Sequence, residues 1–151
     1  MLSKRNISIS GIVACLFFFF ALTTTIRAAD TTEAIINQID EILKANPLPA
    51  GEKLQRIKVA EDNTVTVLVL RLVAGGEVKA HFHKTHDETV YIIKGTGQFL
   101  VNDKWVDFKP GTLHFNPMGK VHHIKNTGNE LGVVIAIYTP AMKEPDFNFV
   151  Q

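Results

Sequence analysis

The segment "GGEVKAHFHKTHDETVYIIKG", residues 75–95, places three histidines and two carboxylates within the eight positions 81–88. Side chains two residues apart in a strand point to the same face, so we expect His81 and His83 to project together. Glu88 follows a short reversal at the start of the next expected strand, and it can return to that face across an antiparallel pair. Two imidazoles and a carboxylate form a partial site for a divalent transition metal.

A fourth donor comes from a distant part of the chain. The segment "GTLHFNPMGKVHHIKN", residues 111–126, contains His122 directly after the turn sequence "PMGK". All six histidines lie between residues 81 and 123, a distribution that favours one site over scattered surface positions. The sequence therefore predicts four donors from two segments.

Both segments resemble the signature motifs of the cupin family. Residues 75–95 fit G-x5-H-x-H-x4-E-x6-G, and residues 111–126 fit G-x5-P-x-G-x2-H-x3-N, with every fixed position filled. The resemblance implies a double-stranded β-helix, or jelly-roll barrel, with a metal inside. The metal ligands that it implies are His81, His83, Glu88 and His122. The motif glycines are expected at tight turns with positive φ.

The strand pattern outside the motifs agrees with an all-β fold. The β-branched run "TVTVLVLRLV", residues 64–73, predicts a well-buried strand. Turn sequences separate the further strand-like pieces, which are 77–83, 88–94, 97–102, 104–108, 112–116, 121–126 and 131–139. We expect a barrel or sandwich over residues 51–151. It follows one helix at 32–44, within an N-terminal helix and linker at 30–50.

The remaining polar residues of the two motifs are weaker candidates. Possible pocket residues or supports for the ligands are Lys79, His86 and His114. Lys79 shares parity with His81, which makes it a candidate contact for an anionic substrate. His86 lies in the reversal, where a loop position without a site role is the alternative, and the orientation of His114 stays open. Asn126 is expected to brace the strand that follows His122.

The first 29 residues are typical of a signal peptide. Lys4 and Arg5 precede an apolar run at 11–22, and the small residue Ala29 lies before a possible cut. The sequence thus predicts an exported protein, periplasmic or secreted. One alternative is an uncleaved anchor, although the run is shorter than the roughly 20 residues of a membrane span. Another is a lipoprotein modified at Cys15, although the apolar "LFFFF" that follows it is unusual for one.

Composition limits the partners of the mature chain. Without residues 1–29 the chain carries 13 basic and 15 acidic residues and no cysteine. This balance predicts no nucleic-acid surface and, after cleavage, no membrane contact. Histidine and carboxylate ligands without sulfur suit one divalent ion of Fe, Mn, Ni, Cu, Co or Zn and leave its identity open. A homodimer is possible through the N-terminal helix or the C-terminal "PDFNFVQ".

Two functions remain open. The first is a metal-dependent enzyme on a small organic substrate, with a dioxygenase slightly favoured over an isomerase, lyase or decarboxylase; the fold does not choose among them. The second is a non-catalytic exported module that binds a metal or a small ligand. An apolar pocket favours an aromatic or lipophilic substrate, and its expected lining is Val90, Ile92, Phe99, Leu100, Leu113 and Phe115.

Overall fold

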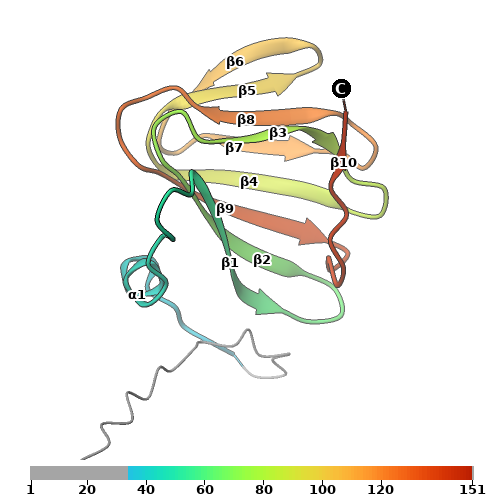
Figure 1. The fold of residues 1–151 in the computed structure, drawn as a ribbon. Coiled ribbons are helices and arrows are strands. Elements are labelled where there is room, and N and C mark those ends of the chain that lie inside the picture. The colour runs from blue at the N-terminus through green and yellow to red at the C-terminus, as the bar shows by residue number, and fades with distance from the viewer. Residues whose placement is uncertain (1–33, 151) are drawn as a thin grey trace, which may run out of the picture.

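Two antiparallel sheets form the body of the protein (Figure 1). The computed structural model describes residues 34–150. Its elements are α1 (Ile39–Ala45), β1 (Leu54–Glu61), β2 (Thr66–Leu72), β3 (Glu77–Phe82), β4 (Asp87–Lys94), β5 (Gly97–Val101), β6 (Lys104–Phe108), β7 (Leu113–Asn116), β8 (His122–Asn126), β9 (Gly132–Thr139) and β10 (Asn148–Phe149). One sheet has the order β1-β2-β9-β4-β7, and the other has the order β10-β3-β8-β5-β6. The all-β, jelly-roll prediction is confirmed.

Each of the eight strand-like pieces predicted from the sequence is a strand, within one or two residues at either end. Two strands were missed. β1 lacks a clean alternation, because its burial pattern is irregular and a bulge separates Lys58 from Ala60 in its pairing with β2. β10 has only two residues and is held by its pairing to β3.

The expected helix is shorter than the sequence pattern suggested. It begins at Ile39, whereas residues 34–38 are not helical and Ile36 is 91% exposed. Only the later apolar residues reach a partner, since Ile42 is buried with Ile57 on the outer face of the β1-β2-β9-β4-β7 sheet. Seven residues have little helical stability of their own, so tertiary packing decides where this helix starts.

The β2 strand is buried on both faces, which explains its nearly continuous apolar sequence. Val69 belongs to the outer cluster beneath α1, while Leu68 and Leu70 belong to the interior core between the sheets. Arg71 is buried on the outer side, and its guanidinium donates to the main-chain oxygen of Leu43 near the end of α1. This bond ties the helix to the sheet.

The motif glycines occupy the backbone positions that the sequence predicted. Gly75, Gly95, Gly111 and Gly119 all have positive φ. At Gly95 a Cβ atom would also lie 2.7 Å from the Cα of Gly132, so no side chain fits there. These turns return the chain from one strand to the next.

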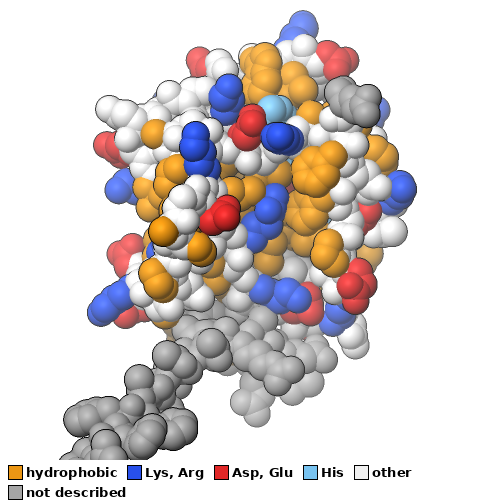
Figure 2. Space-filling model, in the orientation of Figure 1, with side chains coloured by type: hydrophobic (Ala, Val, Ile, Leu, Met, Phe, Trp, Pro, Cys, Tyr) orange, Lys and Arg blue, Asp and Glu red, His pale blue; other side chains and the backbone are white. Residues whose placement is uncertain are grey.

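The two segments proposed for a dimer contact are used within the chain. The helix α1 packs on its own sheet, and β10 pairs with β3 beside the C-terminus (Figure 1). On the face drawn in Figure 2, apolar side chains alternate with acidic and basic ones. The homodimer stays a prediction.

The expected signal peptide, residues 1–29, and Cys15 within it lie outside the described residues. Within residues 34–150, no helix has the length and apolar character needed to span a membrane.

Candidate metal centre

Three histidines predicted as ligands meet between the two sheets. His81 in β3 lies directly opposite His122 in β8 in the antiparallel register. His83 follows the end of β3, and its ring centroid lies 5.0 Å from that of His81 and 5.2 Å from that of His122. One ring nitrogen from each of the three lies within 4.8 Å of the others. All three side chains are buried.

Backbone carbonyls set the tautomer of all three rings. The Nδ1 atom of His81 bonds the oxygen of Lys79 at 2.7 Å, that of His83 the oxygen of Asp146 at 2.8 Å, and that of His122 the oxygen of Lys120 at 2.9 Å. Since a carbonyl only accepts, each Nδ1 carries the hydrogen and each neutral ring keeps a lone pair on Nε2. The Nε2 atoms of His81 and His83 are buried without a hydrogen-bond partner.

Burial favours the neutral form of two of these imidazoles, His81 and His83. Burial and the neighbouring His122 lower the pKa of His81 to about 4. Burial also lowers the pKa of His83, against the opposing effect of its bond to Asp146. Neutral imidazole is the form that binds metals.

Glu88 reaches the histidines from the opposite sheet, which corrects the expected geometry. β3 and β4 belong to different sheets, so Glu88 faces His81 across the interior instead of along an antiparallel pair. The reversal at residues 83–86 carries the chain between the sheets. Glu88 is buried, and its Oε2 atom lies 3.0 Å from Nε2 of His122.

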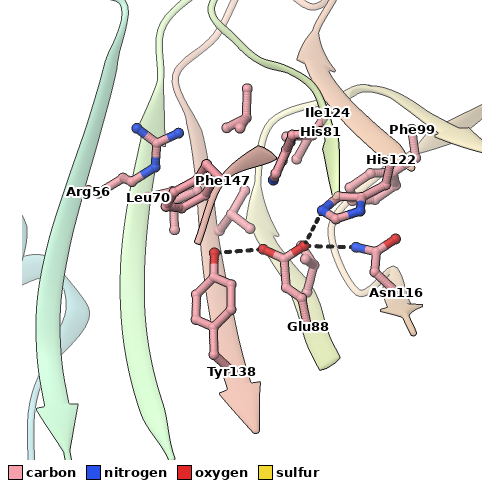
Figure 3. Close-up of a pocket in the computed structure, with 13 residues that line it drawn as sticks. Arg56, Leu70, His81, Glu88, Phe99, Asn116, His122, Ile124, Tyr138 and Phe147 are labelled. Atoms are coloured by element: carbon pink, nitrogen blue, oxygen red, sulfur yellow. Dashed lines mark hydrogen bonds and ion pairs between the residues drawn. The ribbon is translucent and has the colours of Figure 1, made fainter. Parts of the chain in front are cut away.

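The two strands beside β4 orient the Glu88 carboxylate. Tyr138 in β9 and Asn116 in β7 are its direct cross-strand neighbours. The hydroxyl of Tyr138 donates to Oε1 at 2.8 Å, and Nδ2 of Asn116 donates to Oε2 at 2.8 Å (Figure 3). Burial would raise the pKa of Glu88, but the hydrogen bond and charge of His122 and the hydrogen bond from Tyr138 outweigh it and lower the pKa to about 2. Burial raises the pKa of Tyr138 well above 10, so it stays a donor.

The contact between His122 and Glu88 requires a positive charge between its atoms. A neutral His122 would direct its Nε2 lone pair at a carboxylate oxygen only 3.0 Å away, and that arrangement is repulsive. A proton or a metal ion removes the repulsion. The residues present therefore fit a divalent ion.

A second group of possible ligands, which consists of His83, His86 and Asp146, supports the first. The Asp146 carboxylate already accepts from the main-chain nitrogens of Lys84 and Thr85 and from the Thr85 hydroxyl, at 2.7 to 2.9 Å. His86 is buried beside it, with Nε2 3.4 Å from the same carboxylate oxygen. This network fixes the loop that carries His83, and it places His86 next to the ligands instead of in solvent.

The Lys79 side chain does not enter the pocket. A bulge between Val78 and His81 shifts the β3 register by one residue, so these two face the interior and the Lys79 side chain is exposed. Only its backbone oxygen serves the site, through His81. The parity argument was wrong here because one extra residue reverses the alternation.

The side chain of His114 points into the interior, whereas that of His123 lies on the outer surface. His114 is opposite the buried Val90, and its ring packs 4.5 Å from that of Phe99 in the interior. It belongs to neither ligand group among the described residues. His123 is on the outer face, where its Nε2 lies 2.8 Å from Glu77.

Beside the histidines is a narrow pocket (Figure 3). Its lining is Arg56, Leu70, Val78, His81, Glu88, Val90, Phe99, Asn116, His122, Ile124, Val134, Tyr138 and Phe147. Most of this wall is apolar, as predicted, and it includes Val90 and Phe99. The other four residues expected there do not line the pocket. Leu113 and Phe115 are 67% and 56% exposed on the far side of β7, and Ile92 and Leu100 are also absent from the lining.

Several pocket residues were missed by the sequence analysis. Arg56 and Phe147 come from segments whose strands were not predicted. Tyr138 and Asn116 do lie in predicted strands, but no motif marks them. Only their register beside Glu88 could have identified them.

Asn126 braces the strand after His122, as predicted. Its Nδ2 donates to the oxygens of Leu72 and Glu130 at 2.7 and 2.8 Å, and its Oδ1 accepts from the nitrogen of Gly128 at 3.0 Å. The side chain is fully buried. It thus joins the end of β8 to both sheets without contacting the pocket.

Comparisons with known proteins agree with this architecture. The family model described as cupin domain matches residues 68–138. An uncharacterized protein of Aquifex aeolicus is 31% identical over 111 residues, which cover 74% of this chain and 88% of that protein. A crystal structure of a conserved Klebsiella pneumoniae protein with a double-stranded β-helix domain superposes with a TM-score of 0.67. It is 24% identical and covers 78% of this chain and 100% of its own.

Relatives with a named function are matched over part of their length. A glucose-6-phosphate isomerase of Thermococcus onnurineus is 38% identical over 80 residues, which are 48% of this chain and 42% of that enzyme. An oxalate-binding protein of Thermotoga maritima is 40% identical over 60 residues, which are 40% of this chain and 50% of that protein. The chain thus spans half or less of the length of these two relatives.

Proposed function

The chain belongs to the cupin family, and on this premise we propose that it is an exported metal-dependent enzyme that acts on a small organic substrate. The observation that carries the proposal is the buried convergence of three imidazoles with free Nε2 atoms, with Glu88 beside Nε2 of His122. A site of this kind costs folding free energy unless a cation occupies it, because buried polar atoms without partners are unfavourable. His81, His83, His122 and Glu88 would hold one divalent ion of Fe, Mn, Ni, Cu, Co or Zn.

Four protein ligands leave open positions on a six-coordinate ion. Such an ion, when bound, supplies a Lewis acid that polarises a substrate oxygen. The chain itself provides a water-poor wall of apolar side chains and an anionic Glu88. It also provides Tyr138, whose proton is held at Glu88 by a 2.8 Å hydrogen bond. Together these groups support substrate binding next to the metal ligands.

The apolar wall slightly favours dioxygenase chemistry over isomerase, lyase or decarboxylase chemistry. Isomerase chemistry remains a candidate because one of the named relatives is an isomerase. Oxygen uptake separates the two, because a dioxygenase consumes one O2 for each substrate converted and an isomerase consumes none. A screen of aromatic and sugar-phosphate substrates with an oxygen electrode therefore decides between them.

A non-catalytic binding module is the second candidate, since the oxalate-binding relative is 40% identical over its matched part. Ligand binding without turnover in the same screen would support this candidate. The exported location rests on residues 1–29, and fractionation of cells that express the full chain tests it.

The first test of the metal site is elemental analysis of residues 30–151 purified from the export compartment. We expect about one equivalent of a transition metal in the wild type and none in His81→Ala or His83→Ala. Wild-type protein that holds no metal after loading with any of the six ions would overturn the proposal.

A further inference from the structure

Arg56 is the only cationic residue other than histidine among the described residues that line the pocket. It lies on β1 opposite Leu70, on the inner side of the sheet, whereas its neighbour Ile57 belongs to the outer cluster under α1. Because β1 is at the edge of its sheet, Arg56 stands at the open side of the interior. Figure 3 shows it on the side of the pocket away from His122 and Asn116.

The guanidinium group of Arg56 stacks on an aromatic ring and shares the pocket with Glu88, but it forms no ion pair among the described residues. Its Cζ atom lies 4.7 Å from the ring centroid of Phe147, a cation–π contact that leaves the planar N–H edge available. Within residues 34–150, no carboxylate lies within ion-pair distance of Arg56. The other ion pairs at the barrel use Lys58, His86, His122 and His123. Arg56 is an exposed cation at the edge of the pocket, and a guanidinium there without an ion-pair partner in the described part of the chain is available to an anionic ligand.

Phe147 links this cation to the metal ligands. Its ring centroid lies 5.2 Å from that of His81 and 5.3 Å from that of His83. The Cζ atom of Arg56 therefore lies no more than 9.9 Å from the ring centroid of His81. Between them the pocket wall is apolar, with Leu70 and Val134 on β2 and β9.

We propose that Arg56 binds the carboxylate of the substrate, and that the substrate is a small carboxylic acid with an apolar or aromatic body and a second oxygen directed at the metal ligands. The inference rests on the proposed function and names its substrate class. A guanidinium edge offers two parallel N–H donors that match the two oxygens of a carboxylate. The apolar wall would contact the body of the molecule, and the Phe147 ring stacks on the guanidinium group.

Calorimetric titration with 4-hydroxybenzoate and the longer 4-hydroxyphenylacetate tests the proposal. Both carry a carboxylate and a phenol oxygen at opposite ends of an apolar ring, and the matching amides lack only the charge. We expect at least one acid to bind the metal-loaded protein, and its amide to bind about tenfold more weakly. Arg56→Gln should weaken binding of the acid about tenfold and leave binding of the amide unchanged.

The matched control is Lys79→Gln, which removes an equal charge from an exposed side chain near the same site. It should bind the acids as the wild type does. Circular dichroism and metal content establish that each variant is folded and loaded. If neither acid binds the wild type, or if Arg56→Gln binds them equally well, the carboxylate proposal is overturned.

Failure of the carboxylate proposal can be told apart from failure of the metal site. Arg56 is not a metal ligand, so Arg56→Gln should keep the full metal content. The titrations are repeated on protein freed of metal with a chelator, in which Arg56 still faces the pocket. Arg56-dependent binding of the acids there would support the carboxylate site even for a chain that takes up no metal.

Discussion

The two ends of the β3–β8 pair face the same interior and differ in chemistry. At one end Val78 and Ile124 are paired in register and buried in the apolar core. At the other end His81 and His122 are paired in register and equally buried, with nitrogen lone pairs that point inward. One bulge in β3 separates the two ends.

This difference indicates that the two ends have separate roles within one small barrel. The apolar end gains free energy when water is removed, whatever else is bound. The histidine end loses water from polar atoms and recovers the cost only when a cation joins them. We therefore expect the apolar end to determine folding and the histidine end to determine metal binding, and substitutions at each end test this separation.

The largest effect is expected at the histidine end. His122→Ala removes one donor and leaves Glu88 facing an empty position, so metal affinity should fall about 1,000-fold, equivalent to about 4 kcal/mol. The adjacent His123→Ala is the matched control, because His123 lies on the outer face beside Glu77. Competition with a chromophoric chelator measures both. Equal affinities for the two variants would contradict the assignment of His122.

In the apolar core that contains Val78 and Ile124, Ile92→Ala should destabilise the fold without changing the metal site. Ile92 is fully buried in the core, and truncation to alanine typically costs about 2–5 kcal/mol. Urea unfolding of the metal-free protein gives the change in the free energy of unfolding. Metal content of the folded variant should equal that of the wild type, and loss of metal at full folding would refute the separation.

Tyr138→Phe tests the boundary between the two ends. The ring is part of the core, whereas the hydroxyl donates to Glu88 at 2.8 Å. Removing only the hydroxyl leaves one carboxylate oxygen without its donor, so metal affinity should fall about tenfold. Tyr91→Phe, which alters the other tyrosine of the chain on an exposed position of β4, should have no effect. A similar loss in both variants would show that the Tyr138 hydroxyl has no special role.

The smallest effect is expected at Asp146, which supports the loop of His83. Burial opposes ionisation, but hydrogen bonds from Thr85 and its neighbours outweigh it and lower the pKa of Asp146 to about 2 from its usual 3.8. A lowered carboxyl pKa stabilises the fold fully above the unfolded value, and the contribution disappears as the pH falls through the folded value.

Asp146→Asn should therefore lower the free energy of unfolding by less than about 1 kcal/mol near neutral pH. The difference from the wild type should shrink between about pH 4 and pH 2. Urea unfolding of both proteins without metal, across this pH range, gives the measurement. A difference that grows as the solution becomes more acidic would contradict the assigned hydrogen bonds.

Local patterns in the sequence predicted eight of the ten strands in the described residues and brought three of the proposed ligands to one place. Alternation along a strand is a property of the backbone, so the spacing of His81 and His83 placed both on one face. The turn before β8 likewise placed His122 at the start of a strand. The same reasoning failed at Lys79, because a bulge is a feature of the pairing between strands and leaves no local signal.

The sequence by itself determined the all-β class, the turns at positive-φ glycines and the residue types of the metal centre, since each follows from short-range backbone geometry. Only the tertiary structure decided that Glu88 faces the histidines from the other sheet, that Tyr138 and Asn116 flank it, and that Arg56 meets Phe147 at the pocket. The physical reason is distance along the chain. These contacts join segments up to about ninety residues apart, and the packing of two sheets, which no local pattern encodes, brings them together.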